Sequence, residues 1–222
     1  FGGMNSRFYT KLFELLLRLR ANYLWPAMWD NAFNEDDPDN PRLANEYGIV
    51  MGTSHHEPMM RAHKEWTTHR EQYGNGQWNY ATNSAALQAF FREGIARNKD
   101  YENLVTVGMR GDGDQGMATT GSIESDIALL QRTIADQRRI LAEETSTDVT
   151  RIPQVWALFT EVQKLYEQGM RVPDDVTLLW TDDNTGNLRR LPTPEERKRP
   201  GGAGIYYHID MHGGPFAYQW IN

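Results

Sequence analysis

The stretch IVMGTSHHEPMM, from Ile49 to Met60, joins an apolar run to a cluster of polar side chains. An apolar run of this kind, bounded by a glycine, is typical of a buried β-strand. The run is followed by His55, His56 and Glu57, three side chains that can bind ligands or transfer protons. The stretch therefore predicts a strand whose carboxyl end carries functional groups.

The two adjacent histidines raise a question of geometry. Neighbouring residues on an extended chain point to opposite sides, so His55 and His56 face one site together only if the chain bends. We therefore expect one imidazole to be functional and the other to have a structural role. Glu57 is expected to anchor this loop or to orient the functional imidazole. Pro58 is expected to begin the next helix, where its missing N–H costs nothing.

Segments with the spacing of strands and of helices alternate along the chain. The expected strands are 22–29, 48–53, 103–111, 153–159, 175–183 and 204–210. The expected helices are 6–21, 41–48, 59–74, 83–99, 122–144 and 160–170, with Asn5 or Ser6 placed to cap the first. Alternation of this kind implies parallel strand pairing in an α/β protein.

Polar side chains follow nearly every expected strand, and this pattern favours one architecture. They are Trp29, Asp30 and Asn31; His55, His56 and Glu57; Arg110, Asp112 and Asp114; Glu161; Asp182, Asp183 and Asn184; and His208, Asp210 and His212. A doubly wound sheet would gather such groups at one switch point, whereas a barrel gathers them from every strand on one face. We therefore expect part of a (β/α)8 TIM-barrel-like catalytic domain. Residues 1–222 are expected to be a fragment of that single domain, with further N- and C-terminal parts in the full protein.

Composition excludes several kinds of partner. The net charge of −7 argues against a nucleic-acid partner, because nucleic-acid binders carry concentrated basic patches. No window approaches the roughly 20 apolar residues of a membrane span, so no membrane partner is expected. The chain has no cysteine, which rules out disulfides and thiolate metal sites within it.

Three kinds of function fit these residue types. Paired carboxylates with aromatic surfaces nearby are the groups used in glycoside hydrolysis. A metal-dependent hydrolase could instead bind its ion through His55, His56, His208 and Asp182. A non-catalytic carbohydrate-binding module could stack sugars on Trp25, Trp29, Trp180 and Trp220.

Several longer motifs favour the first of these functions. YLWPAMW, EYGIVMGTSHHEPM, GMRGDGD, VPDDVTLLWTDDN, RRLP and GGAGIYYHID occur in an order that resembles glycoside hydrolase family 115, the xylan α-1,2-glucuronidases. The resemblance implies removal of glucuronic acid, or its 4-O-methyl ether, from xylose units of glucuronoxylan. It also implies inversion of configuration, no cofactor, no metal, and a secreted or periplasmic protein. The oligomeric state, including a homo-oligomer, stays open.

The resemblance also implies roles for particular residues. The two catalytic carboxylates are Glu161 and either Asp112 or Asp114. Substrate-binding positions are Trp25 or Trp29, His55 or His56, Asn184 and His208. Two further residues complete the expected substrate-binding set: Glu57 and Arg110, the latter either meeting the uronate or pairing with Asp112, Asp114 or Glu57. Thr160 and Thr185 stand where the family pattern has a lysine and an aromatic residue, which leaves the fine sugar contacts open.

Overall fold

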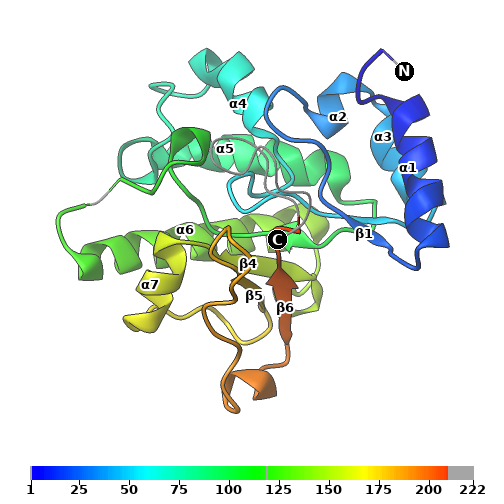
Figure 1. Ribbon diagram of the computed structural model, residues 1–222. Coiled ribbons are helices and arrows are strands. Elements are labelled where there is room, and N and C mark those ends of the chain that lie inside the picture. The colour runs from blue at the N-terminus through cyan, green and yellow to red at the C-terminus, as the bar shows by residue number, and fades with distance from the viewer. Residues whose placement is uncertain (1, 119, 210–222) are drawn as a thin grey trace. The chain divides into compact units, whose positions relative to one another are not determined.

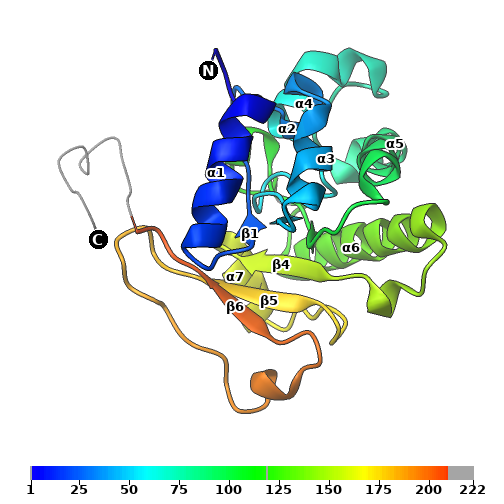
Figure 2. The same cartoon turned by 90° about the vertical axis from the view of Figure 1, so that its right-hand side faces the viewer.

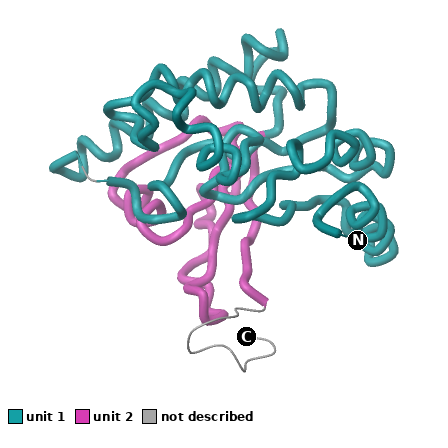
Figure 3. The backbone as a smooth tube through the Cα atoms, turned by 90° about the horizontal axis from the view of Figure 1, so that it is seen from above, with its two compact units in different colours: residues 1–153 teal, residues 154–222 magenta. Residues whose placement is uncertain are grey.

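The computed structural model describes residues 2–118 and 120–209. The chain divides into two compact units, Phe1–Pro153 and Gln154–Asn222, which are coloured separately in Figure 3. Each unit is described by itself.

The helices of the first unit follow the predicted order. They are α1 (Ser6–Arg18), α2 (Phe33–Asp36), α3 (Asp39–Glu46), α4 (His63–His69), α5 (Tyr80–Asn98) and α6 (Ile123–Thr145). Short 3₁₀ helices lie at Arg70–Gln72, Asp112–Asp114 and Val149–Arg151. Figures 1 and 2 show α1 beside α3, and α5 beside α6. Only α2 was not expected, because its four residues lie in a polar segment too short to show helical periodicity.

The first helix illustrates how local chemistry sets these elements. Asn5 takes the cap position, its side-chain oxygen accepting a hydrogen bond from the backbone N–H of Phe8 at 3.3 Å. Tyr9 and Phe13, one turn apart on the same face, are buried. Of the two expected caps, the structure therefore uses Asn5.

The predicted helix start at Pro58 is wrong. Met59 and Met60 have left-handed backbone angles, with φ of 61° and 59°, which interrupt any helix. The helix begins at His63 instead, because the buried carboxylate of Glu65 accepts a hydrogen bond from the N–H of Ala62 at 3.0 Å. Residues 52–62 consequently form a long irregular loop between strand and helix.

The strands of the first unit are short and parallel. β1 (Tyr23–Leu24) pairs with β2 (Val50–Met51) in parallel, and an isolated parallel bridge joins Met51 to Asn103 just before β3 (Val105–Thr106). All three are shorter than their expected segments, because loops that carry polar residues begin soon after each pairing.

The second unit has a parallel sheet of its own. It contains β4 (Gln154–Leu158), α7 (Glu161–Glu167), β5 (Thr177–Thr181), a 3₁₀ helix at Glu196–Lys198 and β6 (Ala203–Tyr206). β5 pairs in parallel with β4 on one side and with β6 on the other. All five residues of β4 are buried, as expected for a strand covered on both faces.

The mixed α/β class with parallel strands is confirmed, whereas a closed barrel is not seen in the described residues. Consecutive strands of the second unit are neighbours in its sheet, so the order contains no switch point there. Among the described helices, none combines the length and apolar character needed to cross a membrane.

Candidate active site

The loop after β2 is held inside the first unit. Every residue from Met51 to Ala62 is buried. Helix α5 approaches this loop closely at Gly94, where a Cβ atom would lie only 2.3 Å from the carbonyl oxygen of Met59. The absence of a side chain at Gly94 thus allows the helix to support the loop that carries the two histidines.

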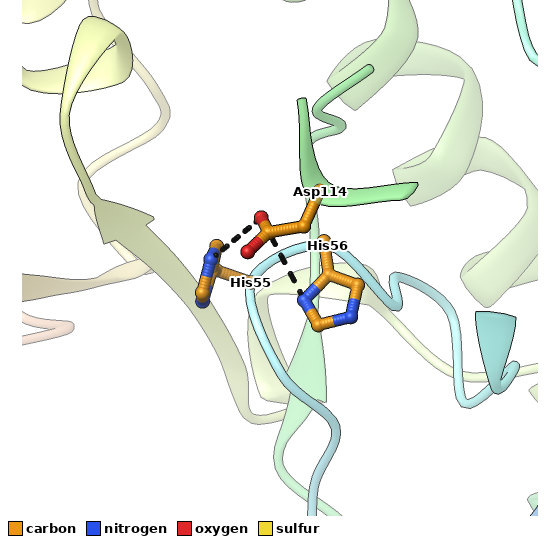
Figure 4. A group of neighbouring side chains, drawn as sticks. All are labelled: His55, His56 and Asp114. Carbon is orange, nitrogen blue, oxygen red and sulfur yellow. Dashed lines mark hydrogen bonds and ion pairs between the residues drawn. The ribbon is translucent and has the colours of Figure 1, made fainter. Parts of the chain in front are cut away.

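His55 and His56 both face Asp114, as Figure 4 shows. Nε2 of His55 lies 3.0 Å from Oδ1 of Asp114, and Nδ1 of His56 lies 3.8 Å from the same oxygen. The chain turns at the two histidines instead of continuing extended. The prediction that only one imidazole would reach the site assumed an extended chain. It is wrong, because the chain bends at these two residues.

Asp114 is placed by a tight glycine-rich turn. Gly111 donates its N–H to the carbonyl of Gln115 at 2.9 Å, and a Cβ on Gly111 would lie 2.4 Å from the carbonyl of Gly116. Asp114 has a φ of 62°, an unfavourable backbone conformation for a residue with a side chain. Such strain is concentrated at functional sites, where the surrounding contacts maintain it.

Arg110 supplies the contacts that hold this carboxylate. Its NH1 donates to the backbone carbonyl of Asp114 at 2.6 Å and to Oδ1 of the same residue. Burial by itself would raise the pKa of Asp114, but the hydrogen bond from His55 and the charges of His55, His56 and Arg110 at low pH outweigh it and lower the pKa to about 2. Asp114 is consequently ionised at neutral pH.

Asp112 points elsewhere. Its side chain is 45% exposed, against 22% for Asp114, and its carboxylate lies 3.4 Å from Nε2 of His63 and 3.7 Å from NH1 of Arg70. The structure therefore separates the two aspartates that the sequence left open: only Asp114 joins the group formed by His55, His56 and Arg110.

His56 lies under an exposed tryptophan. The ring of Trp29 stacks on that of His56 with 4.9 Å between centroids and 24° between planes. Burial lowers the pKa of His56 to about 4, with the charges of His55, His63 and Arg110 acting in the same direction against Asp114. Trp29 is 50% exposed and has a φ of 61°, a second strained backbone at this site. Trp25 is half-buried, and its indole donates to the hydroxyl of Tyr23 at 2.5 Å.

Glu57 has the anchoring contact that the sequence suggested. It is buried, and Oε1 accepts the N–H of His63 at 2.9 Å, which ties the loop to the start of α4. Burial raises the pKa of Glu57 to about 8, and the charges of Glu65 and Asp114 add to this effect. Glu57 is therefore a neutral acid at neutral pH.

This pKa predicts a pH dependence of stability. The folded state holds a proton on Glu57 up to about pH 8, whereas the unfolded state loses it near the ordinary value of 4.5, so the free energy of unfolding should fall as pH rises between these values. Glu57→Gln is expected to abolish this part of the pH dependence, because glutamine does not titrate. The free energy of unfolding of the variant, relative to that of the parent protein, should therefore rise between about pH 4.5 and about pH 8. Urea unfolding of both proteins across this range measures the difference, and a constant difference would contradict the prediction.

In the second unit, Glu161 lies where β4 passes into α7. Thr160 precedes it with φ of 46° and ψ of −110°, and its hydroxyl donates to Oε2 of Glu161. The strained residue turns the chain abruptly, so that the carboxylate follows the end of the strand. The expected position of Glu161 at a strand end is thus confirmed, and its catalytic role stays a prediction.

The ends of β5 and β6 bring a second histidine and aspartate together. Nδ1 of His208 lies 2.5 Å from Oδ1 of the buried Asp182, and Oδ2 of Asp182 accepts the N–H of His208 at 3.2 Å. Asn184 has a φ of 67°, and its buried side-chain oxygen has no hydrogen-bond partner in the part of the chain that the structure describes. These contacts fix His208 and leave an amide oxygen available for a donor.

The tryptophans proposed as sugar platforms are only partly suited to that role. Trp180 is 1% exposed, and its ring packs under the guanidinium of Arg190 at 4.0 Å, so it belongs to the core. Trp220 lies outside the described residues. Of the three that the structure describes, Trp29 alone is strongly exposed.

Sequence reasoning missed two residues of the first unit. Oγ of Ser54 lies 3.1 Å from Nδ1 of His55 and 3.2 Å from Nδ1 of His56. The ring centroid of His63 lies 6.3 Å from that of His56. The hydroxyl directly before the two histidines was a visible signal for Ser54, whereas nothing local marks His63.

His55, His56 and Asp114 also have the residue types of a metal site. Ligand atoms of His55, His56 and Asp114 lie within 4.8 Å of one another, which is a suitable spacing for three ligands. Oδ1 of Asp114, however, already accepts from Arg110 and His55, so a cation bound to this oxygen would compete with both side chains. Within the predicted ligand set, His208 pairs with Asp182, and His55 and His56 face Asp114.

In many enzymes of the α/β class, the carboxyl ends of parallel strands carry the catalytic side chains. Here those ends carry carboxylates, imidazoles and an arginine. The sequence model for glycosyl hydrolase family 115 matches residues 1–222. The chain therefore belongs to glycosyl hydrolase family 115. Among solved structures, it is similar to a family GH115 4-O-methyl-α-glucuronidase with specificity for decorated arabinogalactans, at 41% identity and a TM-score of 0.87. That match covers 95% of this chain and 28% of the other, and no curated protein matches significantly.

Proposed function

We propose that the full-length protein removes glucuronic acid, or its 4-O-methyl ether, from polysaccharide side chains by an inverting two-carboxylate mechanism. Family membership supports glycoside hydrolysis, and the structure similar to this chain is described as a 4-O-methyl-α-glucuronidase. The observation that carries the proposal is Asp114, a strained and ionised carboxylate held by Arg110 and His55 at the end of a strand.

Asp114 and Glu161 are proposed as the catalytic pair. Inversion requires one carboxylate to accept a proton from the attacking water and one carboxylic acid to protonate the departing oxygen. Asp114 suits the role of base, because its lowered pKa keeps it ionised. Glu161 is then the acid.

In this proposal, the sugar is recognised by aromatic, imidazole and amide side chains. Trp29, His56, Asn184 and His208 are proposed to contact it, with Trp25 and His55 supporting them. Glu57 is assigned to the loop rather than to the sugar, since it is buried and bound to the backbone of His63.

The proposed substrate is glucuronoxylan with α-1,2-linked uronic acid. The structure similar to this chain is described as specific for decorated arabinogalactans, so that polymer is the necessary comparison. Release of uronic acid from both polymers should be measured side by side on full-length protein. A higher kcat/KM on the arabinogalactan would make that polymer the preferred substrate and would contradict the proposed glucuronoxylan. The proposed release of uronic acid would stand.

Product stereochemistry tests the mechanism. Proton NMR during hydrolysis should show the β-anomer of the uronic acid first, because inversion of an α-linkage gives that configuration. A first-formed α-anomer would contradict the two-carboxylate inverting mechanism. Full activity after exhaustive chelation would in turn count against the metal-dependent alternative.

The remaining proposals concern context. We propose that this chain forms part of a (β/α)8-type catalytic domain, which the sequential parallel strands support. The protein is proposed to act outside the cytoplasm, in a secreted or periplasmic location, because its polymeric substrate does not cross membranes. Activity recovered only in the cytoplasmic fraction of the native cells would contradict this location.

A further inference from the structure

A single hydroxyl group connects the two histidines of the first unit. Oγ of Ser54 lies within hydrogen-bond distance of Nδ1 of His55 and of Nδ1 of His56, and the serine is fully buried. A hydroxyl has one hydrogen to donate and lone pairs that accept. Ser54 therefore cannot donate to both rings: where it donates to one, the other must donate to it.

The direction of these bonds follows from Asp114. Its carboxylate is ionised, so Nε2 of His55, at 3.0 Å from it, must carry a hydrogen. In an uncharged His55, Nδ1 then has no hydrogen and accepts the bond from Ser54. Ser54 in turn accepts from His56, whose Nδ1 must carry the hydrogen of that ring.

The remaining nitrogen of His56 is thereby determined. A neutral imidazole with hydrogen on Nδ1 has a bare acceptor at Nε2. Nε2 of His56 is buried and has no hydrogen-bond partner among the described residues. An acceptor in this position is costly unless a ligand or a water supplies a donor.

We propose that Ser54 is a positioning residue that fixes the tautomers of both histidines and so presents Nε2 of His56 as an acceptor for a sugar hydroxyl. The identity of the donor rests on the proposed function. A hydroxyl suits the site, because Trp29 covers the face of the His56 ring and an aromatic face packs well against a sugar. If the hydrogen bonds of Ser54 ran in the opposite direction, Nε2 of His56 would carry a hydrogen and could not accept a bond from that hydroxyl.

Neutron diffraction of full-length protein tests the tautomers directly. Crystals at mildly alkaline pH should show deuterium on Nε2 of His55 and on Nδ1 of His56. Deuterium on Nε2 of His56 would overturn the proposal. This result does not depend on activity, so a protein that releases no uronic acid would refute the proposed function and leave the tautomer assignment intact.

Kinetics of Ser54→Ala tests the consequence for substrate. Losing one neutral hydrogen bond should lower kcat/KM about tenfold, mainly through KM. Thr53→Val is the matched control, since Thr53 is also buried in this loop and its hydroxyl has no hydrogen-bond partner within residues 2–118 and 120–209. Monodeoxy uronosides identify the donor: replacing its hydroxyl should weaken binding to the parent protein and change binding to Ser54→Ala much less. Equal sensitivity of both proteins to every deoxy analogue would overturn the link between Ser54 and substrate.

Discussion

Asp114→Asn is expected to lower kcat on glucuronoxylan by about 10²- to 10⁴-fold, the usual contribution of a positioned base. The substitution keeps the size of the side chain and removes the charge held by Arg110 and His55. Steady-state kinetics of full-length protein, with thermal unfolding as a check on folding, measures the effect. Loss of less than about tenfold would remove Asp114 from the catalytic pair.

Asp112→Asn is the matched control. The same chemical change two residues away falls on an exposed carboxylate that faces His63 and Arg70. We expect kcat to stay within a few-fold of the parent value, because an exposed ion pair contributes little. A larger loss for Asp112→Asn than for Asp114→Asn would reverse the assignment.

The leaving group distinguishes base from acid. The leaving group of an activated aryl uronoside departs with little protonation. A variant without the catalytic acid should therefore keep much of its activity on this substrate, whereas a variant without the base should not. Asp114→Asn should therefore be equally impaired on natural and activated substrates, and Glu161→Gln should recover on the activated one. If the activity of Asp114→Asn recovered on the activated substrate instead, Asp114 would be the acid and Glu161 the base.

Arg110→Ala is expected to lower kcat/KM about 10²-fold and equally on acidic and carboxyl-reduced substrates. Arg110 is nearly buried and contacts both the backbone and the carboxylate of Asp114, so its first role is to hold that residue. Breaking a largely buried ion pair should also reduce the free energy of unfolding by about 3 kcal/mol. A loss confined to the acidic substrate would show instead that Arg110 binds the uronate.

The pH profile gives an independent reading of Arg110. Its positive charge contributes to the low pKa of Asp114, so Arg110→Ala should raise that pKa. A base must be ionised, and the acidic limb of kcat/KM should therefore move to higher pH in Arg110→Ala. Arg110→Lys, which keeps the charge, should move the limb less. An unmoved limb in Arg110→Ala would contradict the contact between the two residues.

Local sequence was sufficient for most of the helices and strands, though not for α2 or the start of α4, and for the residue types of the site. The apolar spacing of the first helix, with its Asn5 cap, predicts that helix because capping and burial involve residues three or four apart. The alternation of strands and helices predicted parallel pairing. It also placed carboxylates and imidazoles at strand ends, where the structure has them.

Only the tertiary structure decided which of these groups meet. His55 and Asp114 are 59 positions apart, and it is Asp114, with a left-handed backbone that few residues other than glycine adopt, that meets the histidine. The chain turns at both histidines within the 52–62 loop, which also packs against α5 at Gly94. Periodicity and propensity encode contacts between near neighbours, whereas such long-range contacts and strained backbone angles are imposed by the packing around them.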